Sequence, residues 1–88
     1  MSKPLFSEDA WNDYMYWLSQ DRKTISKINT LIKDIMRNGT SKGLGKPEIL
    51  KGDMSGYYSR RINEQDRLIY RLIDGDIIEI VSCKGHYE

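Results

Sequence analysis

The sequence predicts an α+β fold, in which two N-terminal helices precede a run of antiparallel strands. Apolar residues recur every three or four positions through residues 8–38, which is the spacing of amphipathic helices. From residue 48 onward, short runs rich in Ile, Leu, Tyr and Val are separated by Gly, Asn and Asp, as in strands joined by tight turns. Helices grouped ahead of the strands are expected to cover one face of the sheet.

The length of 88 residues predicts a single domain over residues 1–88. No apolar run approaches the roughly 20 residues that span a bilayer, and the first residues lack the apolar segment of a signal peptide. The only cysteine, Cys83, has no internal disulfide partner, which favours a reducing compartment, the cytoplasm. With one Cys and one His, neither a metal site nor a cofactor is expected.

The first helix is expected to follow a short strand at residues 5–6, with Ser7 as its N-cap. Its apolar stripe follows the i, i+3, i+4, i+7 spacing and consists of Trp11, Tyr14, Met15 and Leu18. Tyr16 and Trp17 lie off this stripe. These two aromatic residues are either partly packed or part of a partner surface.

The second helix is predicted to begin after Asp21, a good N-cap, and to end at Gly39. Its apolar stripe consists of Ile25, Ile28, Ile32, Ile35 and Met36. The link between the helices is short, so they are expected to form an antiparallel αα-hairpin. The apolar stripe of this hairpin requires a cover, and the sheet is the candidate.

Residues 39–47 contain three glycines and a proline and are predicted to form a mobile loop across the sheet. The glycine spacing fits neither a P-loop nor a dinucleotide fingerprint. Strands are expected at residues 48–51 and 77–83, and a hairpin between them turns at residues 63–66. The run Asp74-Gly75-Asp76 is typical of a tight turn.

The hairpin strands carry four arginines, which are costly to bury without partners. Its second strand has apolar residues on both faces, which predicts the middle of the sheet. Residues 22–71 hold twelve Lys and Arg against five acids, whereas both flanking segments have a net charge of −3. The hairpin is therefore a candidate floor for a site that binds a phosphate-bearing ligand, although scattered solvated charge explains the same numbers.

Cleavage of RNA without a metal requires a base for the 2′-hydroxyl, a cation for the phosphate and an acid for the leaving 5′-oxygen. Glu48, the arginines and His86 supply these chemical types. Tyrosines at positions 57, 58 and 87 are candidates for stacking on bases. Each residue alone is more commonly a surface or packing group, so the residue pattern leaves an RNA-cleaving site as one alternative.

Several short motifs occur in order along almost the whole chain. They are Ser7-Glu8-Asp9-Ala10-Trp11-Asn12-Asp13-Tyr14, Lys27-Ile28-Asn29, Leu31-Ile32-Lys33-Asp34, Gly45-Lys46-Pro47-Glu48, Leu50-Lys51, Ser55-Gly56-Tyr57-Tyr58-Ser59-Arg60-Arg61-Ile62, Arg67-Leu68-Ile69-Tyr70 and His86-Tyr87. With these motifs the chain resembles the YoeB branch of the RelE-type bacterial toxins, which are ribosome-dependent mRNA interferases. Each motif is weak alone, but their order and spacing together are specific.

The resemblance implies a RelE-like, microbial-ribonuclease-like antiparallel sheet with the αα-hairpin on one face. It also implies roles for three residues: Glu48 as general base, Arg67 as the group that stabilises the transition state, and His86 as general acid. The residues it implies as RNA contacts are Lys51, Arg60, Arg61 and Tyr87, with Arg61 the stronger candidate of the arginine pair.

The resemblance further implies cleavage of mRNA in the ribosomal A site and inhibition by a YefM-type antitoxin that covers this face. Operator DNA would be contacted indirectly, through the toxin–antitoxin complex. A homodimer is a further possibility, with Tyr16 or Trp17 as contact residues. The alternative function is a binding module that blocks translation without cutting, whereas a DNA-binding role alone is disfavoured because no helix-turn-helix with a basic recognition face is evident.

Two residues depart from the family pattern near the end of the chain. Gly85 stands where relatives often have a bulkier residue, so a looser tail before His86 is expected. Glu88 follows Tyr87, where relatives commonly end. Its carboxylate either repels RNA or moves the terminal charge outward.

Overall fold

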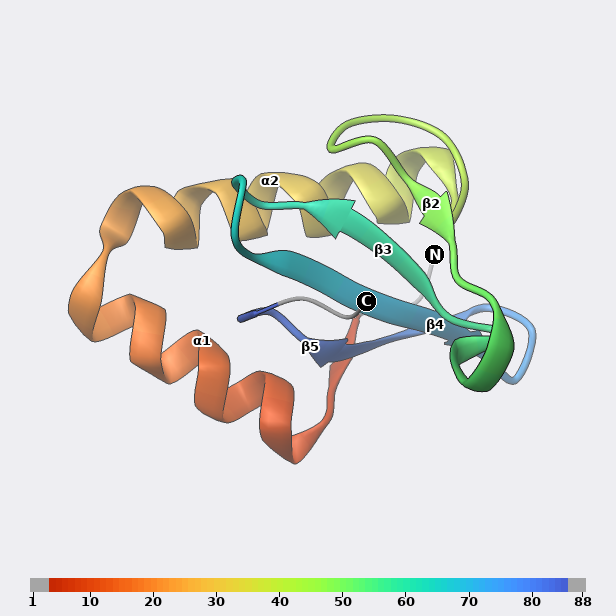
Figure 1. Ribbon diagram of the computed structural model, residues 1–88, viewed down its shortest axis with the longest axis horizontal. Helices are drawn as coiled ribbons and strands as arrows, with labels where there is room; N and C mark the ends of the chain where they lie inside the picture. Colours follow the sequence, from red (N-terminus) through yellow and green to blue (C-terminus); the bar gives the residue numbers. More distant parts are fainter. Residues whose placement is uncertain (1–3, 86–88) are drawn as a thin grey trace.

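The computed structural model describes residues 4–85 and places two helices on one face of a five-stranded sheet (Figure 1). The elements in chain order are β1 (Leu5–Phe6), α1 (Glu8–Gln20), α2 (Arg22–Asn38), β2 (Glu48–Ile49), the 3₁₀ turn η1 (Gly52–Met54), β3 (Tyr58–Arg61), β4 (Arg67–Ile73) and β5 (Ile77–Ser82). The predicted α+β class, with an N-terminal αα-hairpin against a sheet, is confirmed.

The strands lie in the order β1-β5-β4-β3-β2. All neighbouring pairs are antiparallel except β1 and β5, which are parallel, with Leu5 opposite Glu79 and Phe6 opposite Ile80. The sheet is therefore mixed rather than wholly antiparallel as predicted, because the edge strand β1 runs parallel to its neighbour β5. β4 is the central strand, as its apolar residues on both faces predicted.

The predicted helix ends are confirmed. The Ser7 hydroxyl accepts a hydrogen bond from the Ala10 N–H, and the Asp21 carboxylate accepts from the N–H groups of Lys23 and Thr24. The N–H of Gly39 donates to the Ile35 carbonyl and ends α2. The hydroxyl of Ser7 also donates to the Val81 carbonyl at 2.8 Å, which fixes the start of α1 beside β5.

The core lies between α2 and the covered face of the sheet. α2 contributes Ile28 and Ile35, which belong to the predicted apolar stripe, and also Leu31, which the prediction did not include. The sheet contributes the buried side chains of Leu68, Tyr70, Ile78 and Ile80. These residues form one hydrophobic cluster with Ala10, Ile62 and Cys83.

The buried face of α1 differs from the predicted stripe. Trp11 and Leu18 are 51% and 41% exposed, whereas Ala10 is fully buried and Trp17 packs against the core. A spacing of three and four residues fits two overlapping stripes in this helix, and small Ala10 allows the helix to approach the sheet closely. Of the two alternatives for the aromatic pair, partial packing is confirmed for Trp17, which is therefore not an exposed candidate for a dimer contact, whereas Tyr16 is 45% exposed.

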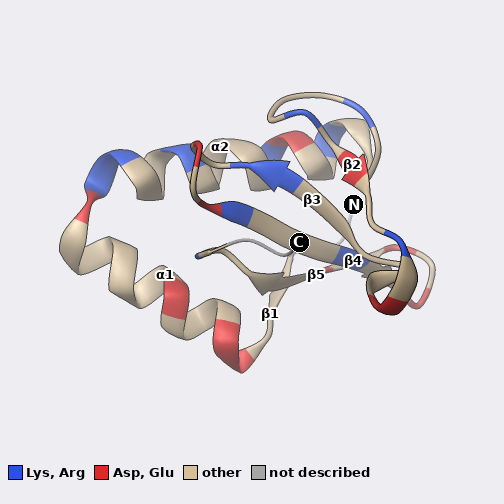
Figure 2. Cartoon of the chain, viewed as in Figure 1, with Lys and Arg blue, Asp and Glu red and all other residues tan. Residues whose placement is uncertain are grey.

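Charge is unevenly distributed over the elements (Figure 2). α1 contains acids but no Lys or Arg, whereas the cations of the middle segment lie along α2, β3 and the start of β4. Within residues 4–85, neither helix is both long and apolar enough to cross a bilayer. The cationic part of the chain thus lies on α2, on the loop that follows it and on β3 and β4.

Candidate functional site

The sheet face away from the helices carries the predicted general base and two predicted cations. Glu48 is opposite Ser59 across β2 and β3, and Arg61 is opposite Arg67 across β3 and β4. Residues paired in this way point to the same face, as do residues two apart in one strand. Glu48, Arg61 and Arg67 therefore share one face, and strand spacing places the Cα atoms of Glu48 and Arg67 about 12 Å apart.

Arg67 is held at the turn between β3 and β4. Its Nη1 donates to the carbonyls of Asn63 and Asp66, at 2.8 and 3.2 Å. Its Nε and Nη2 donate no hydrogen bond to another residue in the range 4–85. The turn carbonyls thus orient the group without neutralising its charge.

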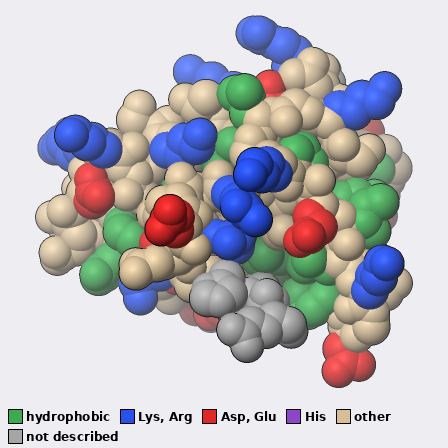
Figure 3. Space-filling model, turned by 45° about the horizontal axis from the view of Figure 1, so that its top comes forward, with side chains coloured by type: hydrophobic (Ala, Val, Ile, Leu, Met, Phe, Trp, Pro, Cys, Tyr) green, Lys and Arg blue, Asp and Glu red, His purple; other side chains and the backbone are tan. Residues whose placement is uncertain are grey.

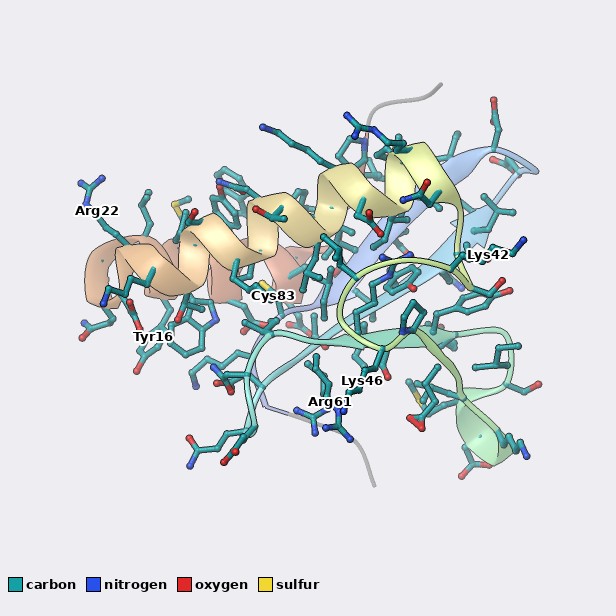
Figure 4. The ribbon with its side chains drawn as sticks, turned by 90° about the horizontal axis from the view of Figure 1, so that it is seen from above. Tyr16, Arg22, Lys42, Lys46, Arg61 and Cys83 are labelled. Carbon is teal, nitrogen blue, oxygen red and sulfur yellow. The ribbon has the colours of Figure 1, made fainter. Side chains whose placement is uncertain are left out.

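Arg61 and Glu48 are exposed, and neither side chain has an ion-pair partner among the described residues. Figure 4 shows Arg61 extending from β3 on the side away from α2, with Lys46 close to it. Lys51 is also exposed, at the start of η1. In Figure 3, Lys and Arg side chains gather near the centre of one face of the molecule.

Arg60 is not part of this open face, which corrects the expectation that it contacts RNA. Its side chain is fully buried, because Arg60 pairs with Leu68 on the face covered by the helices. Nε donates to the Tyr70 hydroxyl, Nη1 to the Asp34 carboxylate and the Leu44 carbonyl, and Nη2 to the carbonyls of Gly39 and Lys42. All five N–H donors are therefore used within the protein.

These contacts also explain the loop at residues 39–47, which was predicted to be mobile. The loop wraps around the Arg60 guanidinium, and the Tyr70 hydroxyl donates to the Thr40 carbonyl at 2.6 Å. A side chain at Gly43 would collide with the Asp34 carboxylate, since its Cβ would lie 1.9 Å from Oδ2. The loop is thus built on specific contacts, and it leads directly into Glu48.

Two pKa shifts follow from the Arg60 cluster. The Leu44 N–H, followed by the Arg60 guanidinium, holds the pKa of Asp34 below its usual value because both favour the charged carboxylate. Burial raises the pKa of the Tyr70 hydroxyl, which stays protonated and donates to the loop. Asp34 and Tyr70 therefore have structural roles at neutral pH.

The chain that leads to His86 is held by four hydrogen bonds to its backbone. The Cys83 N–H donates to the Asp13 carboxylate, and the Trp17 indole donates to the Cys83 carbonyl. The Gly85 N–H donates to Asp66 at 2.8 Å, and its carbonyl accepts from the Arg67 N–H at 2.7 Å. Up to Gly85 the tail is therefore not loose, contrary to the expectation from the missing side chain.

The predicted residues His86 and Tyr87, and also Glu88, lie outside the described residues. Gly85, the residue before His86, is bonded to the backbone of Arg67. Of the other tyrosines considered for base stacking, Tyr58 stacks on Tyr70 with ring centroids 5.6 Å apart and belongs to the core. Tyr57 lies under the Arg71 guanidinium, 5.4 Å from ring centroid to Cζ.

Cys83 lies beneath α2 in the core (Figure 4). Burial raises the pKa of its thiol to about 12, so the group stays protonated and is a poor nucleophile. Across residues 4–85, no three His, Cys, Asp or Glu side chains are grouped closely enough to hold a metal ion.

The sequence prediction missed the residues that organise the site from a distance. Asp34 lies outside the predicted apolar stripe of α2, and nothing in the local pattern indicated that it pairs with Arg60. Asp13, Trp17 and Asp66 hold the tail through contacts 19 to 70 residues apart in sequence, for which no local pattern exists. For Arg60, strand alternation was the available signal, because Arg60 and Arg61 must point to opposite faces.

Comparison with known proteins assigns the family. Residues 6–87 match the family described as "YoeB-like toxin of bacterial type II toxin-antitoxin system". The chain belongs to this YoeB-like toxin family. The match runs from Phe6, the second residue of β1, past the end of β5 and includes every residue of the open face discussed above.

YoeB toxins of several bacteria are similar to the chain over nearly its full length. Toxin YoeB of Escherichia coli (strain K12) is 46% identical over 85 residues, which are 97% of this chain and 99% of the relative. The structure of the YoeB dimer from Staphylococcus aureus is 50% identical, covers 97% of both chains and gives a TM-score of 0.89.

The heterotetrameric YoeB–YefM toxin–antitoxin complex from Staphylococcus aureus contains a chain 49% identical to this one. The similarity covers 99% of both chains, with a TM-score of 0.89. The helix pair, the mixed sheet and their connections are thus those of the YoeB-like toxins, with a RelE-like fold.

Proposed function

We propose that this YoeB-like toxin is a ribosome-dependent endoribonuclease that cleaves mRNA in the ribosomal A site. The observation that carries the proposal is the shared sheet face of Glu48, Arg61 and Arg67, with Gly85 bonded to the backbone of Arg67. A carboxylate and two guanidiniums around one open surface suit a phosphodiester and a base that deprotonates its neighbouring hydroxyl.

In the proposed mechanism, Glu48 removes the proton of a ribose 2′-hydroxyl. The 2′-oxygen attacks the adjacent phosphorus, and the negative charge that builds up on the phosphate is stabilised by Arg67, with Arg61 as a second cation. The bond to the 5′-oxygen then breaks, and His86 donates a proton to that oxygen. The products are a 2′,3′-cyclic phosphate end and a free 5′-hydroxyl, so no metal or cofactor is consumed.

The assignment of His86 as the acid rests on chain geometry and on the family. Consecutive Cα atoms are about 3.8 Å apart, so His86 begins one residue from a position fixed beside Arg67. Lys51, Arg61 and Tyr87 are proposed as RNA contacts. Arg60 is not, because its donors are all occupied.

The proposed partners follow from the related complexes. The Staphylococcus aureus relative is bound to YefM in one structure and is a dimer in another. We propose a YefM-type antitoxin and a possible homodimer for this chain, which would act in the bacterial cytoplasm on translating ribosomes. Operator DNA would be bound through the antitoxin of the complex.

The test is cleavage of mRNA on programmed ribosomes by the wild type and by Glu48→Gln, Arg67→Ala and His86→Ala. Each change is expected to slow cleavage by about 10²-fold or more and to relieve growth arrest on expression. Asp53→Asn is the matched control, because this exposed acid lies in η1 and is not part of the site.

Mapping message ends by primer extension separates cleavage from the alternative of a non-cleaving translation block. Discrete codon-linked breaks that depend on Glu48 support the nuclease. Arrested translation with intact message, or breaks unchanged in all three variants, would refute it.

A further inference from the structure

A pocket with a volume of about 330 Å³ adjoins the open face at the end of β3. Three of its lining residues are cations from three different segments: Lys27 of α2, Lys46 of the loop and Arg61 of β3. The volume is at the lower end of the range for ligand pockets and suits a phosphate with part of its nucleotide. Glu64, at the tip of the hairpin turn, is the one acid in this lining.

The three cations are not neutralised within the part of the chain that the structure describes. The two ion pairs there are Arg60 with Asp34 and Arg71 with Glu79, and neither involves a lining residue. Lys27, Lys46 and Arg61 are all exposed. With Glu64 as the one acid in the lining, the three cations leave an excess of positive charge, and an anion bound between them relieves their mutual repulsion.

Gly45 explains how the loop reaches α2. Its carbonyl accepts the Arg61 N–H at 2.7 Å, and its Cβ, if present, would lie 2.8 Å from Leu31 Cδ2. Leu31 is one helical turn beyond Lys27, on the same side of α2. The missing side chain of Gly45 thus brings Lys46, Arg61 and Lys27 around one hollow.

Lys46 adds an independent observation, because its φ of 53° lies in the left-handed region. Glycine or asparagine is favoured at such a position, and a long side chain is disfavoured there. Lys46 lines the pocket from this turn of the loop. Figure 4 shows Lys46 and Arg61 next to each other.

The pocket is continuous with the proposed cleavage site through two links. Arg61 lines the pocket and is paired with Arg67 across the sheet, and Lys46 is two residues before Glu48. An RNA strand whose scissile phosphate lies at Arg67 therefore has a neighbouring phosphate within reach of the pocket. We propose that Lys27, Lys46 and Arg61 form a second phosphate subsite, which binds a backbone phosphodiester of RNA next to the one that is cleaved.

This subsite rests on the proposed function for its placement but is tested by binding rather than by cleavage. The probe is a single-stranded RNA hexamer with 2′-deoxy substitution, which cannot be cleaved, titrated by fluorescence anisotropy at several salt concentrations. For single strands, the slope of log binding constant against log salt concentration decreases in magnitude by about 0.7 for each phosphate contact that is lost. Lys27→Ala and Lys46→Ala are each expected to reduce the slope by that amount.

Lys33→Ala is the matched control, because it removes the same charge from an exposed position of α2 outside the pocket. It is expected to leave the slope unchanged. A dinucleotide with a single phosphodiester is the second control, since it fills only the cleavage position. Lys27→Ala should bind this dinucleotide as the wild type does, and circular dichroism melts confirm that both lysine variants fold.

Titration of vacant ribosomes distinguishes two sources of the phosphate. A Lys27→Ala defect with the hexamer supports a subsite for the message. A defect with vacant ribosomes alone would overturn the proposal, because the phosphate would then belong to ribosomal RNA and not to the strand that is cleaved. Equal salt slopes for Lys27→Ala, Lys46→Ala and Lys33→Ala, with the hexamer and with vacant ribosomes, would overturn the subsite. Tighter binding of an acidic peptide than of RNA in this pocket would overturn it as well. The nuclease proposal is tested independently of the subsite, by cleavage of mRNA by the wild type on programmed ribosomes.

Discussion

Arg60 and Arg61 are neighbours in β3 and carry the same chemical group, but they lie on opposite faces of the sheet. Arg60 is fully buried against the helices, and its five N–H donors bind a carboxylate, a hydroxyl and three loop carbonyls. Arg61 is exposed on the open face, and its guanidinium makes no hydrogen bond to the described residues. One arginine connects helix, loop and sheet, and the other is free to bind an anion.

The comparison separates two kinds of positive charge that composition counts as equal. A buried guanidinium with every donor satisfied contributes to stability and to the shape of the loop before Glu48. An exposed guanidinium without partners contributes little to stability and much to phosphate binding. Substitutions at the covered face should therefore change the free energy of unfolding, and substitutions at the open face should change RNA cleavage.

The largest expected effect comes from the arginine pair itself. Arg60→Met keeps most of the buried side-chain volume but removes all five donors, so Asp34 and the loop carbonyls lose their partner. Removing one member of a buried charged network costs about 3 kcal/mol or more of unfolding free energy. Arg61→Met should cost less than about 0.5 kcal/mol, as is usual for exposed positions. Urea unfolding followed by circular dichroism measures both.

Cleavage on programmed ribosomes completes this pair of measurements. Arg61→Met should fold like the wild type and cleave more slowly. If Arg60→Met fails to fold, Arg60→Lys retains the charge and is expected to be intermediate in stability. Equal stabilities for Arg60→Met and Arg61→Met would contradict the division of roles between the two faces.

A second matched pair concerns the two tryptophans of α1. Trp17 packs on the core and its indole N–H donates to the Cys83 carbonyl at 2.8 Å, whereas Trp11 is 51% exposed. Trp17→Phe loses that hydrogen bond and part of the packing, with an expected cost of about 1 to 2 kcal/mol in thermal or urea unfolding. Trp11→Phe makes the same chemical change and should cost less than about 0.5 kcal/mol. A larger loss of stability for Trp11→Phe than for Trp17→Phe would indicate that the buried face of α1 is the stripe predicted from the sequence.

The smallest expected effect is a pH dependence that originates at Asp34. Its pKa is held below the ordinary value in the folded protein, first by the Leu44 N–H and then by Arg60. The contribution of Asp34 to stability is therefore complete above its unfolded pKa of about 3.9 and is lost as pH falls through the lower folded pKa. Asp34→Asn should be less stable than the wild type at pH 7, and the difference should narrow below about pH 4. A difference that is constant from pH 7 to pH 3 would exclude this ionisation as the cause.

Local patterns in the sequence predicted the helices, their caps, the central strand and the hairpin turn. They failed where two alternatives satisfy one local rule. In α1 the stripes of Trp11 and of Ala10 both have helical spacing, and contacts with β5 and Cys83 decide between them. The loop at residues 39–47 is Gly-rich like a mobile segment, but its order depends on Arg60, which is far along the chain.

The site shows the same limit. Residue types and the family resemblance predicted Glu48, Arg61 and Arg67 as site residues, and the strand register brings these three to one face. Nothing local indicated that Asp66 would hold Gly85, or that Lys27 and Lys46 would share a pocket with Arg61. These contacts arise from the close approach of the loop and the tail to the sheet.

The most direct measurement of the division between the faces is NMR of the arginine side-chain Nε–H groups during titration with the uncleavable RNA hexamer. The Arg60 signal should be protected from exchange and unmoved by RNA, because its donor is bound to the buried Tyr70 hydroxyl. The signals of Arg61 and Arg67 should shift as RNA binds. A shift of the Arg60 signal, with the Arg61 and Arg67 signals unchanged, would contradict the assignment of RNA binding to the open face.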